Sequence, residues 1–227
     1  MSQYLEVEMQ CPRCKAKGKA KLWPALNSKE DPNETELLLK NRLFDFECPK
    51  CNALTRTAYM MDYSDVENNV VIHMVTPQDV PELDRKLHMI ENNVASFSIG
   101  ASSVELTEFS DMLSKKRHRI VVDQNALIEK AIIFNAGLDD RVVEMVKMIY
   151  GNNLVETHPE LKFDDILFLI DNGNRMLQIM YQGNGVGQIE MQNDVYTALE
   201  EDFKEILKND GTYIVDHNWA RNVLSNP

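Results

Sequence analysis

The sequence predicts an α+β protein with a small β-rich module at the N-terminus, followed by a region of helices and a β-hairpin. Period-2 alternation precedes each of two Cys-Pro-x-Cys motifs, and helical spacing begins near Asp123. Residues 1–60 carry a net charge of +2 and residues 61–227 one of −14. Since 227 residues suffice for one large domain or two small ones, this difference favours two, 1–122 and 123–227.

The N-terminal module is expected to contain several strands and one inserted helix. LEVEMQ alternates apolar and polar residues before the first motif, and RLFDFE does so before the second. Between them DPNETELLLKNR predicts a short helix capped by Asp31 or Asn33. LTRTAYMM and NVVIHMV predict two further strands, with DYSDVEN as the turn between them.

The next region is predicted to be mainly helical. TPQDVPELDRKLHMIENN indicates a helix that begins after Pro81, whereas VASFSIGASSVELTEF shows no clear period. DQNALIEKAIIFNAGLDDRVVEMVKMIYGNN predicts a pair of helices joined at GLDD. Gly137 fits the end of the first helix, and Asp139 fits the N-cap of the second.

The C-terminal part is expected to form a hairpin and then a helix. DNGN lies between two apolar runs in DDILFLIDNGNRMLQIMYQGNGVGQIEM and is a strong hairpin signal, and GNGVG predicts a second turn. DVYTALEEDFKEILKND has helical spacing. YIVDHNWARNVL predicts a last short strand and a helical turn.

The composition is that of a folded protein, because 44% of the residues are hydrophobic and 26% are charged. No signal-peptide pattern and no apolar run of about 18 residues is present, so we expect a cytoplasmic protein without a membrane partner. The net charge of −12 argues against a protein whose whole surface binds phosphate backbones.

All four cysteines fall into two CxxC pairs, Cys11 with Cys14 and Cys48 with Cys51. Two such turns can supply the tetrahedral four-thiolate set that structural zinc prefers. The 33 residues between the pairs exceed the ~15–20 of a simple zinc ribbon, and the predicted helix accounts for the excess. We therefore expect a zinc-ribbon-like module that binds Zn²⁺ in a closed site, with no open position for substrate.

The cysteines have three other possible interpretations. A disulfide framework is rare in the cytoplasm. A thioredoxin-like redox pair needs one CxxC at the start of a helix, whereas here each pair follows a strand. An iron–sulfur cluster can use four cysteines too. The sequence favours zinc and leaves iron open.

A stripe of lysines follows the first pair, at Lys15, Lys17, Lys19 and Lys21. On a strand these side chains share one face and could follow a phosphate backbone. They could equally protect an edge strand from unwanted pairing, which is the interpretation we favour. KKRHR at 115–119 is interpreted as a solvated surface loop.

No catalytic residues are assigned, and the protein is expected not to be an enzyme. The five histidines lack HxxxH or HExxH spacing, GNGVG lacks the Lys-Ser/Thr of a P-loop, and no GxSxG occurs. Asp62 and Asp65 are interpreted as turn residues.

CPRC, CPKC, AYMMDYSD and EKAIIFNAGLDDRVVEMVK together resemble the CpXC-domain family of prokaryotic proteins, over most of residues 5–150. The resemblance implies that 1–122 is a zinc-binding domain with a zinc-ribbon-like site at the four cysteines, in a family without an established activity. Family members often have Gly directly after each pair, where this chain has Lys15 and Asn52. Asn tolerates the left-handed conformation and Lys does not, so the first turn is expected to be strained or shaped differently.

These observations predict a non-catalytic protein-interaction or scaffolding module that binds a protein partner or self-associates. The alternative is a nucleic-acid-binding accessory protein that uses the lysine stripe.

Overall fold

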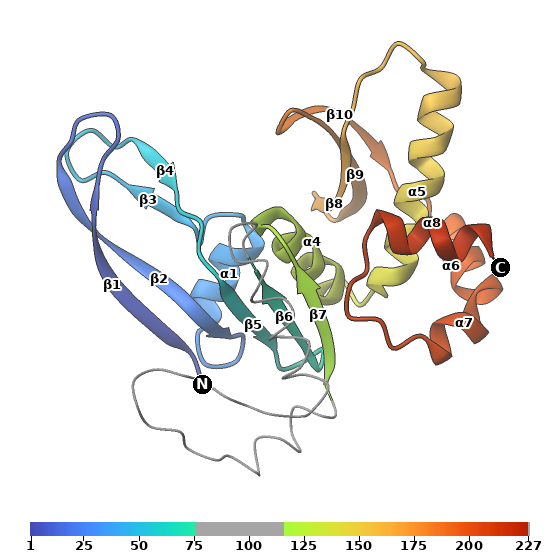
Figure 1. Cartoon of the computed structure of the whole chain (residues 1–227), viewed down its shortest axis with the longest axis horizontal. Helices are drawn as coiled ribbons and strands as arrows, with labels where there is room; N and C mark the ends of the chain where they lie inside the picture. The colour runs from blue at the N-terminus through green and yellow to red at the C-terminus, as the bar shows by residue number, and fades with distance from the viewer. Residues whose placement is uncertain (76–115, 227) are drawn as a thin grey trace. The chain divides into compact units, whose positions relative to one another are not determined.

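The computed structural model describes residues 1–75 and 116–226, and it confirms the α+β class (Figure 1). The chain divides into two compact units, Met1–Leu127 and Ile128–Pro227. Each unit contains its own β-sheet. In the described ranges, no helix is both long enough and apolar enough to span a membrane.

The first unit is built on a five-stranded sheet with the order β1-β2-β5-β6-β7. β1 and β2 pair antiparallel from end to end, but β2 pairs with β5 only at Ala25–Asn27. The rest of β1 and β2 therefore forms a two-stranded ribbon that extends beyond the sheet (Figure 1). The strands are β1 Gln3–Gln10, β2 Lys17–Asn27, β5 Met61–Asp65, β6 Val70–Met74 and β7 Arg117–Val121.

The predicted inserted helix is confirmed as α1 at Pro32–Leu39. Asp31 occupies its N-cap position, although the Asp31 side chain makes no capping hydrogen bond, and Pro32 lies in the first turn. The second motif follows β3, Asp45–Glu47, which pairs antiparallel with β4, Leu54–Arg56.

The predicted turn at DYSDVEN is wrong in its position. Its first four residues belong to β5, and the turn begins at Val66. Tyr63 pairs with Ile72 of β6, and Asp65 accepts hydrogen bonds from the backbone and side-chain amides of Asn68. Pairing with neighbouring strands thus overrides a polar composition that is typical of turns.

The interpretation of KKRHR as a solvated loop is also wrong for its described part. Arg117–Val121 is β7, which pairs parallel with β6, and both His118 and Arg119 are buried. The ring of His118 bonds His73, and the Arg119 guanidinium donates to the His118 carbonyl. The helix predicted after Pro81 lies outside the described residues.

The predicted pair of helices is confirmed as α4, Gln124–Asn135, and α5, Asp140–Thr157. Gly137 adopts φ +69° at the end of α4, as a C-terminal glycine does. Asp139 caps α5, because its carboxylate accepts from the backbone N–H of Arg141.

The hairpin at DNGN is confirmed, with Asn172 and Gly173 both at positive φ. The second turn lies at Gln182 and Gly183 rather than across GNGVG, and the C-terminal helix is broken at Phe203. The last predicted strand is not formed at Tyr213–Val215, whereas the helical turn predicted after it is confirmed as a helix. The elements are β8 Asp165–Asp171, β9 Asn174–Tyr181, β10 Asn184–Glu190, α6 Asn193–Asp202, α7 Lys204–Asn209 and α8 His217–Ser225.

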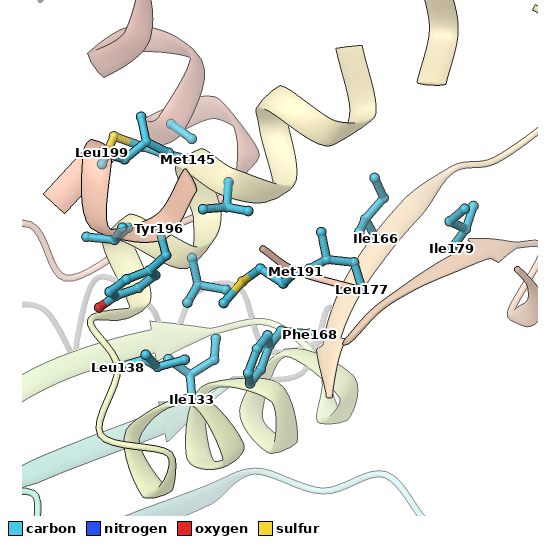
Figure 2. Packing of buried hydrophobic residues seen from close by; sticks show 14 of the residues in the cluster. Ile133, Leu138, Met145, Ile166, Phe168, Leu177, Ile179, Met191, Tyr196 and Leu199 are labelled. Atoms are coloured by element: carbon cyan, nitrogen blue, oxygen red, sulfur yellow. The ribbon is translucent and has the colours of Figure 1, made fainter. Parts of the chain in front are cut away.

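The core of the second unit lies between its helices and one face of its sheet. Ile133 of α4 and Met145 of α5 are fully buried in one cluster with Phe168 of β8 and Leu177 of β9. Figure 2 shows these side chains converging with Tyr196 and Leu199 of α6. Apolar residues at alternate positions of β8 and β9 therefore fix which face of the sheet is covered.

Five charged side chains are buried beside this core and alternate in sign. Lys130 lies 3.0 Å from Asp140 and 4.0 Å from Glu144, and Lys147 lies 3.1 Å from Glu144 and 2.9 Å from Glu129. Burial raises the pKa of Glu129. Burial also acts to lower the pKa of Lys147, but the neighbouring carboxylates outweigh it and raise that pKa. We call this group the buried charge chain.

Candidate metal centre

Two turns with the same backbone geometry carry the four cysteines. In the first turn, Cys11–Ala16, the N–H of Cys11 donates to the Ala16 carbonyl and the N–H of Lys15 donates to the Cys11 carbonyl. In the second turn, Cys48–Ala53, the N–H groups of Cys48 and Asn52 make the same two bonds. All four distances lie between 2.9 and 3.0 Å.

Lys15 and Asn52 occupy equivalent positions and both adopt the left-handed conformation, with φ of +61° and +54°. Asn is tolerated there, whereas a side chain such as that of Lys is penalised by roughly 1–2 kcal/mol. The expectation of strain in the first turn is therefore met, while the two turns do not differ in shape.

The turns bring the four sulfur atoms together. All of them lie within 4.8 Å of one another, with 3.7 Å between Cys11 and Cys51 and 3.5 Å between Cys14 and Cys48. A tetrahedral ion with metal–sulfur bonds of ~2.3 Å requires sulfur–sulfur separations of about 3.8 Å. The donor set and its spacing therefore fit one tetrahedral metal ion.

The site lies where the β1–β2 ribbon meets the β3–β4 hairpin (Figure 1). Cys11 and Cys48 are fully buried and pack with Phe46 of β3. A Cβ added to Gly18 of β2 would lie 2.8 Å from the Pro49 ring and 2.9 Å from the Phe46 ring. Only glycine fits at this position without displacing the second turn.

Closely packed thiols cannot all ionise unless a cation is present. The N–H of Lys50 points at the Cys48 sulfur, 3.5 Å away. This bond is the largest of several hydrogen bonds that together lower the pKa of Cys48 to about 6, against the opposing effect of burial. The N–H of Ala53 acts to lower the pKa of Cys51, but the neighbouring thiols, with Cys14 first, raise it to about 12. A bound divalent ion stabilises every thiolate at once, so all four cysteines can then be ionised together.

The structure bears on two of the alternatives for the cysteines. The four residues are free thiols, and the separations of 3.5 and 3.7 Å are far longer than a disulfide bond of ~2.05 Å. Neither CxxC begins a helix, since β2 follows the first turn and β4 follows the second. The geometry of a thioredoxin-like redox pair is therefore not found at either motif.

The lysine stripe is divided between a turn and a strand. Lys15 belongs to the first turn, whereas Lys17, Lys19 and Lys21 lie along β2 with exposed side chains. Lys17 pairs with Glu8 at 2.7 Å and Lys19 with Glu6 at 3.6 Å, both on β1. Lys21 lies over the Tyr4 ring, 4.6 Å from its centroid.

The sequence does not predict a polar group, largely buried, that joins β5, β6 and β7. Nδ1 of His73 lies 3.0 Å from the Asp62 carboxylate, and Nε2 of His73 lies 3.0 Å from Nδ1 of His118. The two rings are nearly parallel at 8°, with centroids 5.3 Å apart, so they are joined edge to edge. Sequence spacing does not reveal the group, because His73 and His118 are 45 residues apart in the sequence. The pairing of β6 with β7 brings their rings within hydrogen-bond distance.

A family model described as CpXC protein matches residues 9–147, more than half of the chain. The match contains both turns and all four cysteines. No curated protein and no solved structure matches the chain.

Proposed function

The chain belongs to the CpXC protein family, and we propose that its four cysteines hold a structural zinc ion in a non-catalytic protein-interaction module. The observation that carries the proposal is the cluster of four sulfur atoms within 4.8 Å of one another. Thiolates are soft ligands, and a tetrahedral set of four is typical of structural zinc.

The zinc-ribbon-like arrangement is part of the proposal. Each metal-binding turn joins two short antiparallel strands, β1 to β2 and β3 to β4. The metal would tie these two hairpins together at their ends. It would thus replace a hydrophobic core that such small elements cannot form alone.

A structural role follows from the ligand count. Four protein ligands complete the coordination of zinc and leave no position for water or substrate. Two of the four cysteines are fully buried, which further separates the ion from solvent. The proposal also includes a cytoplasmic location, because free thiols persist in a reducing compartment.

Exposed apolar residues near the two hairpins support an interaction role. Tyr4, Leu5 and Leu54 are each more than half exposed. Lys17 and Lys19 already pair with glutamates of β1, so these contacts do not favour the lysine stripe as a nucleic-acid site.

Elemental analysis of the purified protein tests the metal assignment. We expect one zinc and no iron per chain, and the variant Cys48→Ser should lose the metal and unfold the hairpins, since zinc supplies ~10–16 kcal/mol in small modules. Thr55→Ser, on β4 beside the second turn, is the control and should retain zinc. Full zinc content and an unchanged melting temperature in Cys48→Ser would contradict the four-cysteine assignment.

A further inference from the structure

The metal end of the first unit presents three basic side chains. Arg13 and Lys15 lie on the first turn and Lys50 lies on the second, and all three are exposed. Neither turn contains an acidic residue. Within the ranges that the structure describes, none of the three forms an ion pair. We call these residues the basic tip.

The basic tip differs from the lysines of the neighbouring ribbon. Lys17 and Lys19 are paired with Glu8 and Glu6, so their charges are largely compensated. A zinc ion with four thiolates would carry two formal negative charges, and the exposed Glu47 beside Cys48 adds a third. The three cations balance these charges, and their exposed side chains are the positive groups that an anionic partner can meet.

Apolar groups lie among these charges. Pro12 and Pro49 are exposed on the two turns, and Leu54 is 56% exposed directly after the second turn. Buried apolar contacts surrounded by charge are typical of protein interfaces. The turns offer no aromatic side chain on which a base could stack.

We propose that the basic tip binds an acidic segment of a partner protein, whose carboxylates meet Arg13, Lys15 and Lys50 while an apolar side chain contacts Leu54. This inference rests on the proposed function, because the metal holds the two turns together. It adds the chemical class of the partner and the surface that recognises it.

A protein partner fits better than a nucleic acid. Three cations can pair with a few carboxylates, whereas affinity for nucleic acid grows with the number of phosphates neutralised. The net charge of −12 also repels a long polyanion, but acts less on a short acidic segment.

The metal is expected to keep the three residues of the basic tip close together. Lys50 is separated from Lys15 by 34 residues of intervening chain. The shared cysteine cluster brings the two turns to one place, together with the packing of Gly18 against Pro49. Removal of zinc should therefore disperse the three charges and abolish binding, even though no charged residue is changed.

The test uses matched variants of the whole protein. The tip variant is Arg13→Gln, Lys15→Asn and Lys50→Gln, in which Lys15→Asn copies the residue at the equivalent position of the second turn. The ribbon variant is Lys17→Gln, Lys19→Gln and Lys21→Gln. It removes the same charge from two lysines that pair with glutamates and from one that lies over the Tyr4 ring. Zinc content is measured first, and it reports on the proposed function separately from binding.

Three fluorescein-labelled probes are compared by anisotropy at low salt. They are a glutamate-rich peptide containing leucines, the same peptide with glutamine in place of each glutamate, and an oligothymidylate of equal length. We expect the unchanged protein to bind the acidic peptide most tightly. The tip variant should bind it about tenfold more weakly and the ribbon variant within about twofold of the unchanged protein.

Several outcomes would overturn the inference. These are equal loss of binding in both variants, tighter binding of the oligothymidylate than of the acidic peptide, or full binding by zinc-depleted protein. If sedimentation showed that the tip variant alone fails to self-associate, the occupant would be a second copy of this chain and not a separate partner. Should the tip variant hold less zinc, Lys50→Gln alone replaces it.

Discussion

At the scale of single residues, Lys15 shows how a cysteine turn sets the backbone of the residue that follows its second cysteine. Its φ of +61° matches the +54° of Asn52, although lysine disfavours this conformation. The hydrogen bond from the Lys15 N–H to the Cys11 carbonyl holds the conformation in place. The first turn therefore contains strain that the second does not.

Lys15→Asn should relieve that strain. We expect the free energy of unfolding of the zinc-bound protein to rise by about 0.5–1 kcal/mol, because Asn adopts the left-handed region more readily. Denaturant titration at fixed zinc concentration measures the change. Lys19→Asn, on the exposed face of β2, is the control and should give no gain. A stability of Lys15→Asn at or below that of the parent would show that the turn is unstrained.

At the scale of elements, the close contact of the ribbon with the second turn depends on Gly18. Its missing side chain allows Pro49 and Phe46 to approach β2. Valine normally favours strands, so a loss of stability at this position would report steric conflict and not strand propensity.

Gly18→Val is expected to push the two hairpins apart. Overpacking of this kind destabilises by about 1–3 kcal/mol, and the separation of the turns should also weaken zinc binding, as measured by competition with a chromogenic chelator. The control is Lys19→Val, whose side chain points to the exposed face and should alter stability by about 0.5 kcal/mol or less. Equal zinc affinity in the two variants would contradict the role assigned to Gly18.

Elements whose signals are local could be predicted from the sequence. The two cysteine turns, α1, α4, α5 and the DNGN hairpin each depend on residues a few positions apart. β5 and β7 were mispredicted because their polar residues are satisfied by partners distant in sequence. Asp62 bonds His73 and His118 bonds His73, so residues that suggested a turn and a solvated loop belong to strands, and His118 is buried.

The same distinction applies to the metal centre. The four clustered cysteines could be named from spacing alone, and the basic tip could not, because Lys50 joins Arg13 and Lys15 only through the fold. The pairing of Lys17 with Glu8 likewise depends on the register of β1 against β2. The division of the chain between residues 122 and 123 stays a prediction.

At the scale of the whole molecule, stability is expected to come from two different sources. Residues around the cysteines would depend on zinc, whereas the second unit has a hydrophobic core and the buried charge chain. The buried charge chain contains three carboxylates and two lysines. Loss of one lysine therefore leaves buried carboxylates without a compensating positive charge.

Calorimetry should therefore resolve two transitions that respond to different changes. Zinc removal by a chelator is expected to abolish or lower only one of them. Lys147→Met is expected to lower only the other, by about 3–5 kcal/mol, since breaking a buried pair leaves a buried charge. The exposed Lys162→Met is the control. A single transition that shifts under both treatments would show that the chain unfolds as one cooperative whole.

The equivalence of the two cysteine turns has a further consequence. Cys11–Ala16 and Cys48–Ala53 share their backbone bonds and their one left-handed residue, although the strands around them differ in length. The conformation of each hexapeptide thus depends mainly on its own residues and backbone hydrogen bonds. The chain between them has to bring the two turns face to face, and the residues that constrain it most are those at the contact itself, Gly18 and Phe46.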